Sequence, residues 1–448
     1  MAGRPRYAQM LQLRADLWRV PFAMSVAAIL FFVLTVMVDR DVARGTLHLP
    51  WWLSVGGPDD ARAILGAMIG AVSTVLALIF SVSLLVLTMA ASQLGPRMLA
   101  RFVRDGVTQV TIGLFLASFV YTFLSFVVMR QLPGRLFVPQ LTLCCGVVMV
   151  MASFGFLVVF THRIAMSIQT QNVVARIVGE LHSVVRELMT GEHRLPLRPM
   201  TPAAEAEREA LLSRCAAEGG ALPAASTGFV QEVDVPGLLT AADREDVLIR
   251  LLHRPGQFVM EGAALCQVLP AGRAPAVAAA VRRGMKIGPQ RTLTQDIEFS
   301  IAQLVEIALR ALSPAINDAF TVLTCIDWLG DELRLLDGIL TPGLQAGLGV
   351  DDSGRVRLLW PPLRMGRITK TAFNQIRQAA KGNPAVTIRL LQTFAKLAEQ
   401  AEGADFREAL TQQVEAVWES ASTQELVKAD RADIEAAYRA AREAFGAR

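Results

Sequence analysis

The stretch VPFAMSVAAILFFVLTVMV, residues 20–38, lies between Arg19 and Asp39 and contains no charged side chain. Three more windows of this kind follow, without a charge between their limits: Arg62 to Pro96, Asp105 to Arg130, and Arg135 to Arg163. About 20 apolar residues in a helix cross the hydrocarbon core of a bilayer. The pattern therefore predicts four transmembrane helices, and the second of them is longer than a membrane requires.

The composition of the whole chain agrees with a membrane protein. Of its 448 residues 53% are hydrophobic, and the formal net charge is only +4. Because the basic residues form no block, we expect no nucleic-acid partner, whereas the apolar windows make membrane lipid an expected partner. The five cysteines have no C-x-x-C or zinc-ligand spacing, so we also expect no disulfide, no metal and no cofactor.

The distribution of arginine predicts how the chain is oriented. Cytoplasmic loops of membrane proteins carry an excess of Lys and Arg. In the loop between the first two windows, acidic residues accompany the arginines, whereas the other flanking segments are enriched in arginine. We therefore predict that the tail (1–19) and everything after the spans (20–162) are cytoplasmic. The flanking arginines are Arg4, Arg6, Arg14 and Arg19, then Arg97, Arg101 and Arg104, then Arg163 and Arg176.

Hydroxyl side chains recur at helical spacing in the second and third windows, so that each set falls on one helix face. One explanation is helix packing, because small and hydroxyl residues allow membrane helices to approach closely. The alternative is that a stripe lines a water-filled pore, which would require a homo-oligomer. The candidate pore-lining residues are Thr74, Ser81, Thr88 and Ser92, followed by Thr111, Ser118, Thr122 and Ser125.

Three regions are predicted after the fourth window. Residues 163–226 combine a helical extension with a Pro-rich linker. Residues 227–272 contain short strand patterns around Pro255-Gly256 and form a small β-module. Residues 273–448 are mostly helical. The predicted fold class is an α-helical membrane protein with four transmembrane helices and a cytosolic α+β domain, mostly helical with this small β-module.

The segment RALSPAIND, residues 310–318, interrupts an apolar helical pattern. Pro314 disfavours helix at Ser313, so one helix should end there. Ser313 is then a suitable N-cap and Pro314 a suitable first residue for the next helix. Asn317 and Asp318 would lie in its first turns, where the helix dipole favours a carboxylate. Helix physics alone explains most of this segment.

A functional explanation of the same segment is also open. If the two helices pack as an antiparallel hairpin, Asp296, Glu298 and Glu306 could approach one another. Such a cluster would suit a cation or a polar contact between subunits. The candidate contact residues are Arg291, Gln295, Asp296, Glu306, Ser313, Pro314, Asn317 and Asp318.

Two long runs carry a resemblance to a known family: RTLTQDIEFSIAQLVEIALRALSPAINDAFTVL (291–323) and ASQLGPRMLARFVRDGVTQVTIGLFLASFVY (91–121). With RPGQFVMEG and FNQIRQAAKGNPAV, they resemble the bacterial predicted membrane proteins catalogued as domain of unknown function 2254. Ala319 stands where that family's pattern leads us to expect proline. The resemblance implies the four-span region and the cytosolic domain, and thus a bacterial inner membrane, but it implies no activity.

Three classes of function remain. No Ser-His-Asp order, phosphate-binding loop or H-E-x-x-H motif occurs, so the chain is not predicted to be an enzyme. The uncharged windows argue against proton-coupled transport, which needs ionisable groups at membrane depth. We expect a homo-oligomeric inner-membrane channel or passive transporter with a cytosolic regulatory domain. The alternative is a non-conducting sensor or scaffold, and a membrane-bound enzyme comes third.

Overall fold

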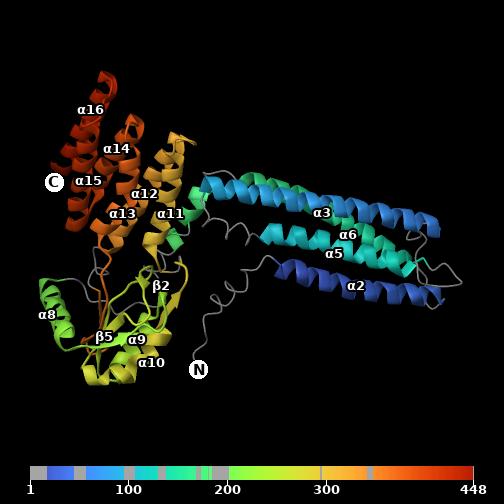
Figure 1. Ribbon diagram of the computed structural model, residues 1–448, viewed down its shortest axis with the longest axis horizontal. Helices are drawn as coiled ribbons and strands as arrows, with labels where there is room; N and C mark the ends of the chain where they lie inside the picture. Colours follow the sequence, from blue (N-terminus) through green and yellow to red (C-terminus); the bar gives the residue numbers. More distant parts are fainter. Residues whose placement is uncertain are drawn as a thin grey trace. The chain divides into compact units, whose positions relative to one another are not determined.

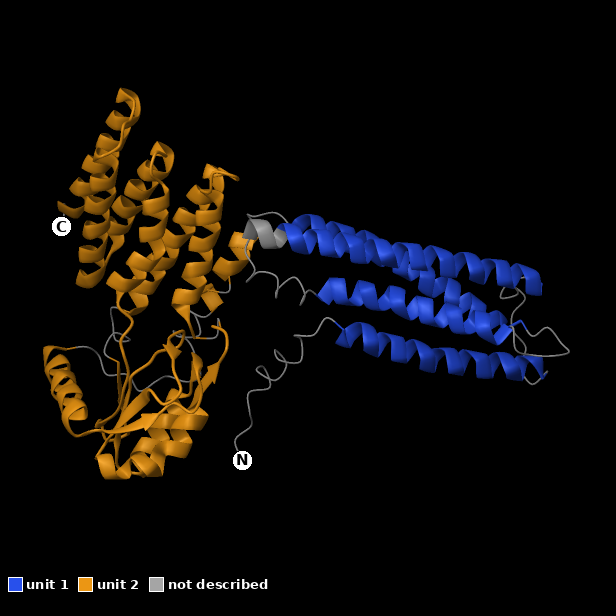
Figure 2. Cartoon of the chain, in the orientation of Figure 1, with its two compact units in different colours: residues 1–172 blue, residues 173–448 orange. Residues whose placement is uncertain are grey.

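The computed structural model describes residues 18–44, 57–94, 106–129, 138–167, 173–179, 181–183, 201–292, 295–340 and 347–446. The chain divides into two compact units, residues 1–172 and 173–448 (Figure 2). Residues 1–17 of the predicted tail, and the predicted loop with Arg97, Arg101 and Arg104, lie outside the described residues.

The described residues of the first unit form four long helices that are drawn side by side in Figure 1. Each is long and apolar enough to cross a membrane, so the described residues contain the four candidate spans that the sequence predicts. Helix α5 is the central one, because it packs against the other three and half of its most apolar window is buried, against 17% for α3. The four are α2 (Arg19–Ala43), α3 (Pro58–Leu94), α5 (Gly106–Met129) and α6 (Gln140–Ser167).

Helices α2 and α5 approach closely where α5 has no side chain. A Cβ atom built on Gly113 would overlap the Met24 sulfur and lie 3.2 Å from the Pro21 backbone. Further along the same contact, the Thr35 and Tyr121 hydroxyls are 2.9 Å apart and both side chains are buried. Small residues and interhelical hydrogen bonds together hold this pair, as is usual between membrane helices.

Helix α2 extends beyond the uncharged window that predicted it. The sequence placed Asp39, Arg40 and Asp41 in a loop, but the helix continues to Ala43 and includes all three. Asp59, Asp60 and Arg62 likewise lie in the first turns of α3. Hydropathy marks the apolar core of a span but not its ends, because a helix can continue into the polar interface.

The second unit begins with helix at 173–179 and 181–183, then a mixed α/β region. A five-stranded sheet has the order β1-β5-β3-β8-β7, and a three-stranded sheet the order β4-β2-β6. The helices of this region are α8 (Pro202–Glu218), α9 (Val235–Arg244) and α10 (Ala274–Gly284). The strands are β1 (Gly220–Pro223), β2 (Gly228–Val233), β3 (Leu248–Leu251), β4 (Phe258–Val259), β5 (Ala264–Leu269), β6 (Met285–Gly288), β7 (Leu348–Val350) and β8 (Val356–Leu359).

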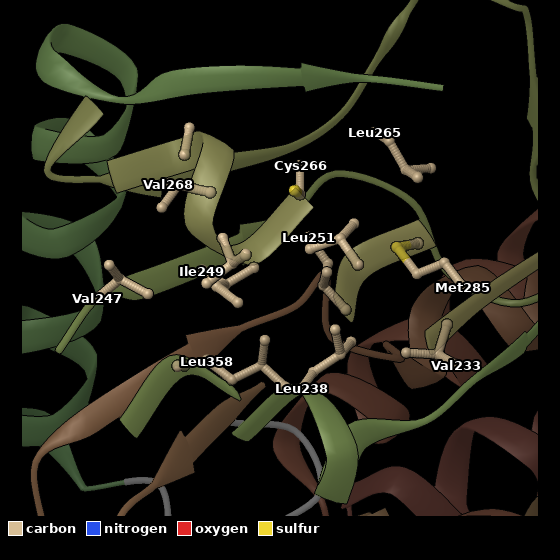
Figure 3. Close-up of a cluster of buried hydrophobic side chains, with 14 of the residues drawn as sticks. Val233, Leu238, Val247, Ile249, Leu251, Leu265, Cys266, Val268, Met285 and Leu358 are labelled. Carbon is tan, nitrogen blue, oxygen red and sulfur yellow. The ribbon is translucent and has the colours of Figure 1, made fainter. Parts of the chain in front are cut away.

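The β region is larger than the predicted module at 227–272. It starts earlier, at β1, and it takes β6, β7 and β8 from the part of the chain that was predicted to be helical. Strand β8 pairs in parallel with β3, with Ile249 opposite Leu358. Both side chains lie in one buried hydrophobic cluster (Figure 3). The two short strands β7 and β8 thus complete a sheet begun about a hundred residues earlier, a pairing that local patterns do not reveal.

The remaining described part of the unit is helical and comprises α11 (Ile297–Ala311), α12 (Ala319–Leu340), α13 (Met365–Ala379), α14 (Pro384–Gln400), α15 (Ala404–Ser422) and α16 (Lys428–Gly446). They stand together, apart from the sheets, in Figure 1. The chain passes from the sheets to these helices twice, between β6 and α11 and between β8 and α13. These two short segments connect the sheet-containing part of the unit to its helical part. The structure therefore confirms a mostly helical protein with a sheet-containing region.

Candidate functional site

The hydroxyl stripe of α3 lies on an exposed helix face. Val72, Ile79 and Val86 are buried, and each precedes a hydroxyl residue by two positions. Two residues turn an α-helix by about 200°, so Thr74, Ser81 and Thr88 face away from the helices that α3 packs against. All three are exposed, and each hydroxyl donates to a backbone carbonyl of its own helix, at Gly70, Ala77 and Leu85. The Ser92 side chain lies outside the described residues.

Small residues continue this face along the helix. A Cβ atom on Gly66 or on Gly70 would meet nothing within 4 Å. With the alanines, these positions recur every three, four or seven residues along one side of the helix, the spacing of a helix–helix contact. We call this surface the α3 face. Its exposed members are Ala63, Gly66, Ala67, Gly70, Thr74, Ala77, Ser81 and Thr88.

The hydroxyl stripe of α5 is placed differently. Thr111, Ser118 and Thr122 have no exposed surface, and Ser125 is 1% exposed. The Ser118 hydroxyl lies 2.8 Å from that of Ser153 on α6, and the other three donate to carbonyls within α5. This is the helix-packing alternative, since a fully buried side chain cannot line a passage along the outside of its subunit. We therefore assign no pore-lining role to these four residues.

Asp39 has a structural role that the sequence did not reveal. Its side chain is buried near the end of α2, and its carboxylate accepts from the backbone N–H groups of Leu141 and Thr142, both at 2.9 Å. The Thr142 hydroxyl donates to the same carboxylate at 2.6 Å. The acceptor thus satisfies otherwise orphaned donors at the α6 N-terminus, where the helix dipole favours an anion. One carboxylate thereby fixes α2 to the start of α6.

In the second unit, the motifs RPGQF and RTLTQDIEF meet between the sheet and α11. Arg291 donates two hydrogen bonds to Asp296, at 2.7 and 2.9 Å, and its guanidinium lies 5.1 Å from the Phe299 ring centre. Asp296 also caps α11 by accepting from the Phe299 N–H. A Cβ atom on Gly256, whose φ is +87°, would collide with the Asp296 carboxylate. Glycine is therefore required here by both space and backbone conformation.

Two neighbouring residues, Gln295 and Glu298, also make polar contacts at the start of α11. Gln295 accepts from the Val233 N–H and donates to the Val233 carbonyl, which ties β2 to the start of α11. Glu298 accepts from Arg254 at 3.0 Å and from Arg367. We call the contacts of Arg254, Gly256, Arg291, Gln295, Asp296 and Glu298 the sheet–helix junction. Burial raises the pKa of the Asp296 carboxyl, against the opposing effect of Arg291.

The acidic cluster that the sequence left open is not assembled. Asp296 pairs with Arg291, Glu298 with Arg254, and Glu306 with Arg310 at 3.4 Å. Each carboxylate thus has its own guanidinium. Among the described residues, no group of three or more His, Cys, Asp or Glu is arranged to hold a metal ion. These pairings explain the acidic residues without a cation.

The predicted N-cap of α12 was wrong by five residues. The helix begins at Ala319, and Asp318 caps it: one carboxylate oxygen accepts from the Thr321 N–H at 3.1 Å, the other from the Thr321 hydroxyl at 2.6 Å. Ser313 instead donates to the Arg310 carbonyl at the end of α11, and Pro314 lies in the intervening turn rather than in the helix. Asn317, at φ +48°, supplies the left-handed residue that redirects the chain.

Capping by Asp318 leads to a direct prediction. Asp318→Ala should lower the free energy of unfolding by about 1 kcal/mol, the usual cost of a lost N-cap, whereas Ser313→Ala should cost clearly less. The measurement is the shift in thermal unfolding of the detergent-solubilised protein. Asp318→Asn is the control, because asparagine caps a helix about as well as aspartate. An equal loss for Ser313→Ala and Asp318→Ala would contradict the assignment.

The architecture defines a multi-span helical membrane protein whose second unit is built on a sheet–helix junction. A family described as "Predicted membrane protein (DUF2254)" matches residues 14–396, and the chain belongs to this family. It is 28% identical over 390 residues to uncharacterized proteins of Mycobacterium bovis and Mycobacterium tuberculosis, covering 84% of this chain and 71% of each relative. No solved structure matches.

Proposed function

We propose that the protein is a homo-oligomeric channel or passive transporter of the bacterial inner membrane, assembled through the α3 face. Both termini and residues 173–448 lie in the cytoplasm in this proposal, and the second unit regulates the pore. The observation that carries it is the position of Thr74, Ser81 and Thr88, which are exposed on the side of α3 opposite its buried residues. Polar groups facing away from the subunit's own helices are expected at an axis between subunits.

The chemistry of the α3 face favours this function over a purely lipid-facing surface. The other spans expose many large apolar side chains, such as Leu30 on α2 and Met151 and Val158 on α6, all at least 67% exposed, with fewer small residues between them, such as Ala152 and Gly155. The α3 face presents glycine, alanine and hydroxyls over most of its length, interrupted by the exposed Leu78 and Leu85. Lipid chains gain little from such a surface, whereas a second helix can approach it closely. Hydroxyl groups can also contact water in a narrow pore.

Assembly is tested first, with a matched pair of substitutions. Gly70→Leu places a bulky side chain on the α3 face and should abolish the oligomer. Gly155→Leu makes the same change on α6, where a Cβ atom also meets nothing within 4 Å, and should leave the oligomer intact. Native mass spectrometry in mild detergent measures multiples of the 48.6 kDa chain. A wild-type monomer, or an oligomer that survives Gly70→Leu, would refute assembly through this face.

Conduction is tested on the oligomer itself. In a background with Cys144 and Cys145 replaced by alanine, Ser81→Cys should react with a water-soluble thiol reagent and reduce ion flux through proteoliposomes. Leu30→Cys on α2, which faces lipid in this proposal, should not react. An intact oligomer without flux and with an unreactive Ser81→Cys would instead favour the non-conducting scaffold, because it would show a dry α3 contact.

A further inference from the structure

A short helical segment follows the fourth span and belongs to the second unit. It comprises residues 173–179 and 181–183. Val174, Ile177, Val178 and Leu181 are all at most 3% exposed. Their spacing of three and four residues places them on one helix face. The segment therefore packs into the second unit through an apolar stripe, and we call it the docking segment.

The docking segment carries one imidazole to a buried carboxylate of α12. His182 Nε2 lies 2.8 Å from Glu332 Oε1, and the Glu332 side chain has no exposed surface. The approach is close but poorly directed, so neither carboxylate oxygen has a hydrogen-bond partner among the described residues. A buried carboxylate in this position is costly in its charged form unless the imidazole next to it carries a proton.

The other charged groups on α12 have partners of their own. Among the described residues, His182 is the one cationic side chain within 4 Å of the Glu332 carboxylate. On α12, Asp337 accepts from the Glu402 and Gly403 N–H groups, and Arg176 on the docking segment is exposed. Four ion pairs hold other charges of α12 and of the helices packed against it. These pairs are Asp331–Arg334, Asp327–Arg389, Glu306–Arg310 and Glu298–Arg367.

We propose that His182 and Glu332 share one proton and act as a latch, which holds the docking segment against α12 and releases it as the pH rises. With one proton the pair is neutral, either as imidazolium and carboxylate or as imidazole and carboxylic acid. Without it, the docked state keeps an uncompensated carboxylate that is buried from water. Undocking relieves this cost, because Glu332 then reaches water.

The pH range follows from the proton held in each state. Burial raises the pKa of Glu332 to about 8, so the docked pair keeps its proton up to that pH. When undocked, the two side chains lie in water, where glutamate has an ordinary pKa of about 4.3 and histidine one of about 6.5. Below pH 6.5 both states therefore hold one proton, and docking changes little with pH. Between about 6.5 and 8 only the docked pair holds it, so docking weakens about tenfold per pH unit, or about thirty-fold in all.

The test is hydrogen–deuterium exchange of the amides of residues 173–179 in the full chain in lipid nanodiscs. Protection factors, corrected for the intrinsic pH dependence of exchange, should be constant from pH 5 to 6.5 and fall about thirty-fold by pH 8.5. Glu332→Gln mimics the protonated acid and should remove the decline. Asp327→Asn, on the same helix at a carboxylate that is 50% exposed and paired with Arg389, is the matched control and should retain the decline.

His182→Gln separates a shared proton from a purely structural contact. Without the imidazole, the undocked state releases its proton near the ordinary glutamate pKa of about 4.3. The decline should therefore begin below pH 6.5, in the range where the wild type is constant. Constant wild-type protection from pH 6.5 to 8.5, or a decline that persists in Glu332→Gln, would overturn the proposal.

Discussion

Asp296→Ala is expected to lower the free energy of unfolding by about 3–5 kcal/mol, the usual cost of removing one partner from a buried ion pair. The change removes both hydrogen bonds from Arg291 and the cap of α11 at Phe299. It also leaves a void beside Gly256, whose Cα hydrogens face the carboxylate's position. Because the sheet–helix junction joins two parts of one unit, the loss should lower the thermal unfolding midpoint of the whole second unit.

Two further variants serve as controls for Asp296→Ala. Asp331→Ala removes a carboxylate that is 38% exposed and paired with Arg334, so it should cost less than about 1 kcal/mol. Asp296→Asn keeps the size and a capping oxygen but loses the charge, and should lie between wild type and Asp296→Ala. If Asp296→Ala were no more harmful than Asp331→Ala in the same thermal assay, the junction would contribute little to stability.

Asp39→Ala is expected to destabilise the first unit by several kcal/mol. Each buried donor left without an acceptor costs about 1–3 kcal/mol, and this change strands the Leu141 and Thr142 amides and the Thr142 hydroxyl. Because the lost contacts join α2 to α6, the expected effect is separation of these helices before the rest of the bundle unfolds. Thermal unfolding in mild detergent gives the size of the loss.

The control for Asp39 lies on the same helix. Asp41 is 51% exposed and 3.5 Å from Arg44, so Asp41→Ala should change stability by less than about 1 kcal/mol. Paired cysteines placed in α2 and α6 near this contact report the separation directly. Cross-linking that is equally efficient in wild type and Asp39→Ala would contradict the role of Asp39 in holding α2 against α6.

The spans could be predicted from the sequence because the signal is local and strong: a bilayer demands a long uncharged helix wherever it is crossed. The role of Asp39 could not be predicted from the sequence. A charge at the edge of an apolar window is compatible with a loop or a helix end, and its partners, Leu141 and Thr142, lie in another span. The exposure of one hydroxyl stripe and the burial of the other were likewise unpredictable, since both share the same periodicity.

The segment RALSPAIND shows how far local rules reach. They correctly predicted two helices separated near Pro314, but Ser313 and Asp318 are both good capping residues. The turn between the helices determines that Asp318 is the cap. In this turn Asn317 adopts a left-handed conformation, and the Asp318 N–H donates to the Ala311 carbonyl at 2.8 Å. The predicted acidic cluster failed because each carboxylate pairs with an arginine: Asp296 and Glu306 with near neighbours in the sequence, and Glu298 with Arg254 and Arg367 from distant parts of the chain.

The pairing of β3 with β8 also limits when the five-stranded sheet can fold during synthesis of the chain. Ile249 meets Leu358 only after about 110 further residues, including α11 and α12, have been synthesised. Until then β3 has one open edge, since its other neighbour, β5, is available early. An open edge is a template for pairing with a foreign strand. Nascent chains that stall before residue 359 should therefore depend on chaperones, and the ribosome must finish the helical hairpin before the sheet can close.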